Sequence, residues 1–161
     1  TNIKLVYNQN AGMQTEMWEK LKETILYIRS KGYRVDGIGW QAHIGLSPTT
    51  KALKENTDLE LKKLSKLIDW AHQNDLEFHV TELDYFIQDK SKLKEGLKSQ
   101  ATFYQKLINV LQKKTKSGVV TLNLWDIGER TKKGKEGAFQ SIYDSKFQPN
   151  PSYNIIKNIN K

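Results

Sequence analysis

The sequence predicts an α/β fold made of four strand–helix units, half the number in an eight-stranded (β/α)8 barrel. Three observations support this prediction. Short β-prone stretches alternate with longer segments whose apolar residues recur at helical spacing. The alternation repeats about every 40 residues, which is typical of parallel βαβ units. Polar residues able to carry chemistry follow the predicted strands, where barrels of this kind place their active sites.

The first part of the chain predicts two strands separated by a helix. Residues 3–7 are apolar and β-prone and predict a strand. Residues 13–30 carry apolar side chains at helical spacing and predict a helix. A second strand is expected over residues 37–41, followed by a polar loop. Gly37 and Gly39 in this strand indicate that neighbouring backbone or side chains approach it closely.

The rest of the chain continues the alternation. Residues 47–49 predict a loop, and Thr57 with Glu60 resembles a capping box that opens a helix ending near residue 74. The later elements are a strand over 77–84, a loop with a helix start over 85–93, a helix over 101–114, a strand over 119–125, a long polar loop over 126–151 and a short helix over 152–159.

The strongest candidate site is an acid pair at the end of the third predicted strand. Residues i and i+2 of a strand project to the same face, so Glu82 and Asp84 should point together. Carboxylates at the end of an apolar strand are costly to bury unless partners or a reaction need them. Gln41 and His43 are also two residues apart, so both side chains can face one side of their strand. A solvated strand end and a hydrogen-bonded structural histidine remain the alternative interpretations.

Composition limits the other function classes. The net charge of +8 comes from lysines scattered over predicted helix faces near acids, which argues against a nucleic-acid-binding protein but leaves attraction to acidic polymers possible. No apolar run is long enough to span a membrane. The chain has no cysteine, and His43, His72 and His79 lack metal-ligand spacing, so no metal or other cofactor is expected.

Taken together, these stretches resemble the family 10 glycoside hydrolases, the β-1,4-xylanases. Residues 4–8 match the fifth strand of the family's TIM barrel and residues 35–43, with the pattern Gly-Ile-Gly-x-Gln-x-His, match the sixth. Residues 81–84 (Thr-Glu-Leu-Asp) match the seventh strand, residues 119–125 the eighth, and the tail from residue 141 to residue 153 the closing segment. The resemblance implies that residues 1–161 form the C-terminal half of the catalytic barrel, strands 5–8.

The resemblance also implies roles for single residues. Glu82 matches the nucleophile of a retaining mechanism, and His43 and Asp84 match the residues that orient it. Further residues match or replace residues that line the sugar site: Asn8, Gln41, Trp125, Glu129 and Arg130. An aromatic ring such as that of Trp125 can pack on the apolar side of a sugar.

The chain also departs from the family. The acid/base glutamate comes from a Trp-Asp-Val-Val-Asn-Glu-like motif on the family's fourth strand, and this motif is absent. After Trp125 the family usually continues with Gly-Val-Thr-Asp, whereas this chain has Asp-Ile-Gly-Glu-Arg at residues 126–130. We therefore expect the N-terminal half of the barrel, in the same or a separate chain, as a partner beside xylan or xylo-oligosaccharide.

The leading hypothesis is an endo-1,4-β-xylanase, inactive as this chain alone, whose nucleophile lies in this chain. The alternative is a non-catalytic xylan-binding half barrel, and a basic module for acidic polymers ranks last. By family, the location is secreted, cell-surface or periplasmic, although residues 1–7 resemble a strand and not a signal peptide.

Overall fold

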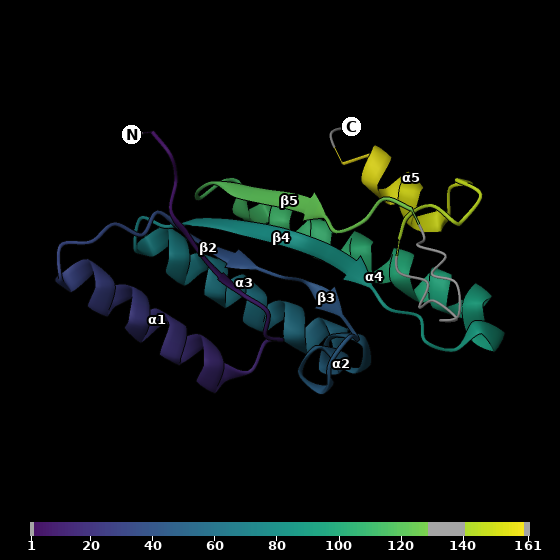
Figure 1. Cartoon of the computed structure of the whole chain (residues 1–161), viewed down its shortest axis with the longest axis horizontal. Coiled ribbons are helices and arrows are strands. Elements are labelled where there is room, and N and C mark those ends of the chain that lie inside the picture. The colour runs from purple at the N-terminus through teal and green to yellow at the C-terminus, as the bar shows by residue number, and fades with distance from the viewer. Residues whose placement is uncertain (1, 129–140, 160–161) are drawn as a thin grey trace.

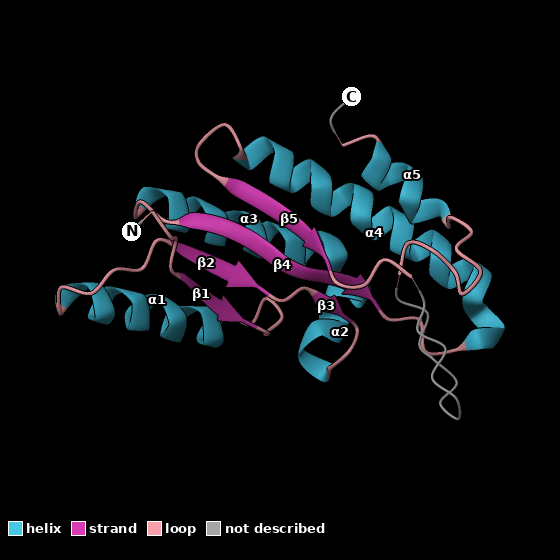
Figure 2. Cartoon of the chain, turned by 45° about the horizontal axis from the view of Figure 1, so that its top comes forward, coloured by secondary structure: helices cyan, strands magenta, loops and turns pink. Residues whose placement is uncertain are grey.

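The computed structural model describes residues 2–128 and 141–159. Within these ranges the strands pair in parallel, and Figure 2 shows them side by side. The order across the sheet is β1 (Val6–Gln9), β2 (Gly37–Trp40), β4 (Glu77–Tyr85) and β5 (Val120–Leu124), with the short β3 (His43–Ile44) beside the end of β4. The parallel α/β class predicted from the sequence is confirmed.

Helices cover one face of this sheet (Figure 1). We call it the covered face, and we call the opposite side, which carries Asn8, Gly39 and Glu82, the open face.

No helix of the described residues is long and apolar enough to cross a membrane. The helices are α1 (Thr15–Ser30), α2 (Pro48–Glu55), α3 (Thr57–Gln73), η1 (Lys90–Lys92), α4 (Leu93–Lys114) and α5 (Pro151–Lys157).

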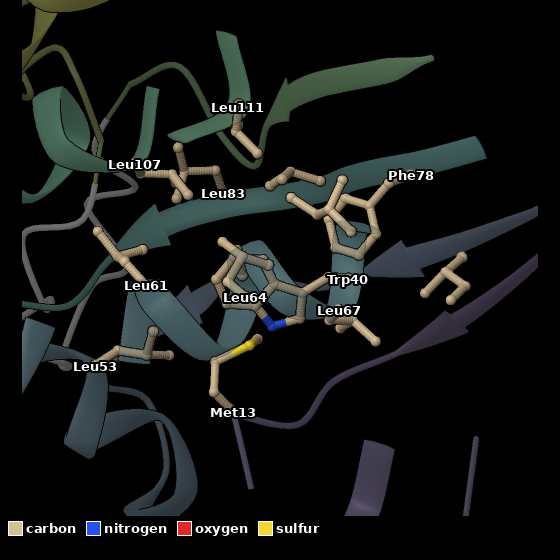
Figure 3. Packing of buried hydrophobic residues seen from close by; sticks show 14 of the residues in the cluster. Met13, Trp40, Leu53, Leu61, Leu64, Leu67, Phe78, Leu83, Leu107 and Leu111 are labelled. Atoms are coloured by element: carbon tan, nitrogen blue, oxygen red, sulfur yellow. The ribbon is translucent and has the colours of Figure 1, made fainter. Parts of the chain in front are cut away.

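The apolar core lies between the covered face and the helices (Figure 3). Ile38 and Trp40 of β2 and Phe78 and Val80 of β4 are fully buried there. They alternate with Gly37 and other residues of the open face, as the period of two along a strand requires. Burial of these large side chains fixes which face of each strand points towards the helices.

The loop after β1 is held by two buried indoles. The Trp40 Nε1–H donates to the Ala11 carbonyl (2.8 Å) and the Trp18 Nε1–H to the Gly12 carbonyl (2.7 Å). A buried indole needs such an acceptor, and these carbonyls need donors. The two bonds therefore tie the segment that follows Asn8 to the core.

The first strand lies later than the predicted residues 3–7. Strand pairing begins at Val6, opposite Gly37 of β2. The preceding Leu5 N–H donates to the Asp36 carboxylate (2.7 Å). Since a side chain accepts from the Leu5 N–H, regular strand pairing starts at Val6, three residues later than the predicted start at residue 3.

Residues 47–49, predicted to be a loop, open helix α2 instead. Ser47 is the N-cap: its hydroxyl accepts from the Thr50 N–H (3.4 Å), and the Thr50 hydroxyl accepts from the Ser47 N–H (3.1 Å). Pro48 occupies the first helical position, where its fixed φ and missing N–H cost nothing. The serine–proline pair is a helix start, and the prediction of a loop was wrong.

The capping box predicted at Thr57 and Glu60 is also wrong. Only Asn56 separates α2 from α3, and α3 has no side-chain cap. The Thr57 hydroxyl donates instead to the Leu53 carbonyl in the last turn of α2 (2.8 Å). Because the two helices follow each other so closely, the hydroxyl satisfies the end of the first helix and not the start of the second.

Two further boundaries differ from the prediction. His43 and Ile44, expected in a loop, form β3 because Asp84 and Tyr85 extend β4 far enough to pair with them. The helix start predicted within residues 85–93 and the helix predicted over 101–114 form one continuous helix, α4, which begins at Leu93 because its first turns also pack on the core.

A buried glutamine fixes the C-terminal segment against α4. The side-chain oxygen of Gln100, which is fully buried, accepts from the Ser152 hydroxyl (2.8 Å) and the Asn150 amide (3.2 Å). Asn150 also caps α5 by accepting from the Ser152 N–H (2.9 Å). A buried amide needs such partners, so these bonds set where α5 packs on α4.

The cap of α2 can be tested by a single substitution. Replacing Ser47 with alanine should lower the free energy of unfolding by about 1 kcal/mol, because the first turn loses its side-chain acceptor. Ser47→Asp should keep most of the stability. Ser99→Ala removes a hydroxyl from an exposed position within α4 and should cause no loss. Urea unfolding measures all three, and an unchanged midpoint for Ser47→Ala would contradict the assignment.

Candidate active site

A bulge in β4 brings both strand-end acids to the open face. Val80 pairs with Leu122 of β5 and Leu83 pairs with Leu124, so three steps along β4 match two along β5. One extra residue shifts the phase of the alternating side chains. Thr81 and Glu82 consequently lie on the same side. Glu82 and Asp84 point together, as predicted, since both contact the ring of His43.

His43 lies between the two acids. Its Nδ1 is 3.0 Å from Asp84 Oδ1, and its Nε2 is 3.2 Å from Glu82 Oε2. The pairing of β3 with β4 sets His43 opposite Asp84. An imidazolium can donate to both carboxylates, whereas a neutral imidazole can donate to only one. The ring therefore fixes the direction of the Glu82 carboxylate, and Asp84 fixes the ring.

Asp84 is the buried member of this group. Its side chain is 1% exposed, against 18% for that of Glu82. Among the described residues, its Oδ2 is buried and has no hydrogen-bond partner. Burial raises the pKa of Asp84 to about 6, and the negative charges of Asp126 and Glu82 act in the same direction, while His43 opposes them.

The other oxygen of Glu82 faces β1. The Asn8 amide donates to Glu82 Oε1 over a long 3.5 Å, and the Thr81 hydroxyl donates to Asn8 Oδ1 (3.0 Å). Each oxygen of the Glu82 carboxylate thus has one partner, His43 from β3 and Asn8 from β1. The arrangement presents a directed carboxylate at the carboxyl ends of the strands.

The remaining predicted residues are distributed around this centre. Trp125 follows β5 and turns its ring at 85° to that of His43, with 5.8 Å between the centroids, and it is 45% exposed. Gln41 follows β2, where its N–H donates to the Gln9 carbonyl (2.8 Å). Glu129 and Arg130 lie outside the described residues, so their predicted role is untested.

The sequence did not single out Thr81. Strict alternation along β4 would put it on the face opposite Glu82, and only the bulge brings the two together. The spacing of buried residues carries the signal: Phe78 and Val80 are two residues apart, whereas Leu83 follows Val80 by three. A change from two to three marks an extra residue in a strand.

The other two histidines have local partners. His72 lies 2.8 Å from the Ser117 hydroxyl and His79 lies 2.8 Å from the Thr121 hydroxyl, in each case through Nδ1. Within residues 2–128 and 141–159, no three histidine, cysteine or acidic side chains form a group that could hold a metal ion.

Comparison with known proteins gives a consistent result. The model of glycosyl hydrolase family 10 matches residues 1–159. Endo-1,4-beta-xylanase A of Thermoanaerobacterium saccharolyticum is 27% identical over 149 residues, which are 91% of this chain and 11% of that protein. Exoglucanase XynX of Acetivibrio thermocellus is 27% identical over 157 residues, 96% of this chain and 13% of that protein.

Solved structures agree on the fold. Xylanase B from Clostridium stercorarium F9 superposes with a TM-score of 0.75 at 23% identity, covering 98% of this chain and 47% of that structure. The solved relatives are TIM barrels, so the described strands correspond to half of such a barrel. The chain spans about half the length of these structures and about an eighth of the two curated relatives.

The burial of Asp84 predicts how stability depends on pH. The folded-state pKa of about 6 lies above the ordinary 3.8, so the folded state holds this proton more tightly. The contribution of Asp84 to the free energy of unfolding is fully present below pH 4 and is lost as the pH rises through about 6. The loss is about 3 kcal/mol, since each unit of pKa shift corresponds to about 1.4 kcal/mol.

Unfolding in urea between pH 4 and pH 7 measures this contribution. Asp84→Asn should remove the fall in unfolding free energy over that range. The matched change Asp58→Asn, at an exposed carboxylate, should keep the slope of the unsubstituted chain. Equal slopes for the unsubstituted chain and Asp84→Asn would contradict the prediction.

Proposed function

Because the chain belongs to glycosyl hydrolase family 10, we propose that it forms the nucleophile-bearing half of a retaining endo-1,4-β-xylanase. The observation that carries the proposal is the single imidazole of His43 held between Glu82 and Asp84 at the carboxyl ends of the strands. A retaining glycosidase needs a carboxylate aimed at the anomeric carbon. Glu82 has partners on both oxygens and remains partly accessible.

In this mechanism a Glu82 oxygen bonds to the anomeric carbon while the glycosidic C–O bond breaks. The leaving oxygen takes its proton from a carboxylic acid on another part of the barrel, and water later hydrolyses the glycosyl–enzyme ester. His43 and Asn8 hold the two Glu82 oxygens through the first step. Asp84 keeps the His43 ring in place and opposes its rotation.

The sugar would meet an aromatic and a polar wall. Trp125, with its ring partly exposed beside His43, offers a face for the apolar side of a xylose ring. Gln41 follows β2 at the same end of the sheet and supplies amide groups for sugar hydroxyls. We include Glu129 and Arg130 in the substrate-binding set on the family resemblance alone.

The rest of the barrel is part of the proposal. β5 lines a groove of about 880 Å³ together with apolar side chains of α4 and α5, among them Leu111 and Ile156. Within the described residues, the strand that pairs with β5 is β4 alone. An open strand edge beside an apolar groove favours pairing with further elements. The N-terminal strands of the family barrel, in the same or another chain, would fill it and bring the acid/base carboxyl. A polymer such as xylan also favours a secreted, cell-surface or periplasmic location.

Removing the nucleophile tests the central assignment. In the protein that carries this chain, Glu82→Gln should lower the release of nitrophenol from an aryl β-xyloside by at least about 10³-fold. Glu77→Gln makes the same change on β4 far from His43, where Glu77 pairs with Lys4, and should stay within about twofold of the unsubstituted rate. A Glu82→Gln protein with the unsubstituted rate would end the assignment.

A non-catalytic xylan-binding protein is the second candidate, because Asp126, Ile127 and Gly128 stand after Trp125 where the family usually has Gly-Val-Thr-Asp. This candidate predicts that calorimetry detects binding of xylo-oligosaccharides and that no nitrophenol is released, even from an activated aryl xyloside that needs little acid assistance.

The preference for xylan needs a separate test, since one relative is named an exoglucanase. Comparing the rates of nitrophenol release from an aryl xyloside and an aryl cellobioside measures it.

A further inference from the structure

Asn8 reaches the candidate nucleophile across an intervening strand. The sheet order is β1, β2, β4, and Asn8 pairs with Gly39 of β2, which pairs in turn with His79 of β4. A Cβ atom at position 39 would lie 2.6 Å from Asn8 Oδ1 and 3.1 Å from Asn8 Cγ. Only glycine leaves room there, so the Asn8 side chain lies over Gly39 and contacts Thr81 and Glu82.

Hydrogen-bond chemistry then sets the orientation of the Asn8 amide. The Glu82 carboxylate, when ionised, only accepts, so the amide NH2 must face it. The amide oxygen then faces Thr81, whose hydroxyl can donate to it at 3.0 Å. With the amide turned over, two oxygens would meet at Glu82. The carboxylate therefore selects the orientation that directs a donor at it, and the hydrogen bond from the Thr81 hydroxyl holds the amide in that orientation.

Packing does not fix this amide on its own. Asn8 is exposed on the open face, so a hydrogen bond, and not close contact, must hold its orientation. Its own bond to Glu82 is long at 3.5 Å. The shorter bond to Thr81 is thus the one that limits the rotation of the side chain.

We propose that Thr81 and Gly39 are positioning residues for the glycosyl-transfer step, acting through the Asn8 amide on the Glu82 carboxylate. Gly39 leaves the space through which the Asn8 side chain crosses β2, and the Thr81 hydroxyl holds the Asn8 amide in place. The proposal rests on the proposed function of Glu82, and it predicts that losing either feature slows the attack of Glu82 on the sugar without unfolding the sheet.

Thr81→Val tests the hydroxyl with an isosteric side chain. In the protein that carries this chain, it should lower kcat on an aryl β-xyloside by about tenfold, with KM within about twofold. Thr81→Ser keeps the donor and should stay within about threefold of the unsubstituted kcat. Thr121→Val removes a threonine hydroxyl of β5 that contacts His79, separated from Asn8 of β1 by strands β2 and β4, and it should leave kcat unchanged.

A spectroscopic readout makes the test independent of activity. The side-chain NH2 resonances of Asn8, identified by their loss in Asn8→Asp, should shift in Thr81→Val and keep their positions in Thr81→Ser and Thr121→Val. Resonances that stay in place in Thr81→Val would overturn the proposed orientation.

Gly39→Ala tests the passage over β2. The atoms that a new Cβ would meet within 3.1 Å belong to the Asn8 and Val6 side chains, so the strand pairing can persist while Asn8 is displaced. The loss in kcat should match that of Thr81→Val, and the two losses should not add, because both act through Asn8. Gly37→Ala adds a methyl group on the same face, where its Cβ would meet the Glu77 carbonyl oxygen and the His79 ring at 3.0 Å. It therefore shows what a strained methyl group on β2 does to kcat when Asn8 is not displaced.

The outcomes separate the two proposals. Full activity in Glu82→Gln would overturn the proposed function, and the Asn8 resonances would still report on Thr81. A normal kcat in Thr81→Val, in a protein that Glu82→Gln inactivates, would overturn the positioning role alone. Equal losses in Thr81→Val and Thr81→Ser, together with a lower melting temperature, would show a structural role and would also overturn it.

Discussion

The candidate site depends on one extra residue in β4. In unbroken alternation, Glu82 and Asp84 would follow Phe78 and Val80 into the apolar layer between sheet and helices. An unpaired carboxylate there costs several kcal/mol or loses its charge. The bulge changes the phase, so Leu83 takes the buried position and the two acids turn to the open face. Bulges beside active sites commonly redirect a side chain in this way.

Elements far apart in the sequence converge on the acids after this phase change. His43 reaches Glu82 from β3, and Asn8 reaches it from β1 over Gly39. Asp84 is held more deeply than Glu82, with a raised pKa and one bond to His43. The pair is therefore asymmetric: one carboxylate is buried and serves as a support, and the other is accessible and directed. Such asymmetry suits a site in which only one acid meets the substrate.

The two faces of the sheet have opposite characters, and this explains how the half barrel holds its shape. Apolar side chains bind the covered face to α1, α3 and α4. On the open face, away from the site, polar side chains contact one another: Lys4 pairs with Glu77 (2.7 Å), and His79 Nδ1 lies 2.8 Å from the Thr121 hydroxyl. Near the C-terminus, the Gln100 side chain holds the segment before α5 by accepting a hydrogen bond from the Asn150 amide. The face that becomes the interior of a barrel is thus polar, and its chemistry lies at the carboxyl ends of the strands.

The sequence by itself determined the alternation of strands and helices, the acid pair and the candidate His43, because periodicity and parity are local properties of the chain. It missed the start of α2 at Ser47, although the local signal was present. Only the tertiary structure shows that Asn8 contacts both Thr81 and Glu82. Asn8 and Glu82 are 74 positions apart, and their contact depends on strand order, on register and on the bulge. These are set by packing of the whole sheet against its helices, which no local pattern records.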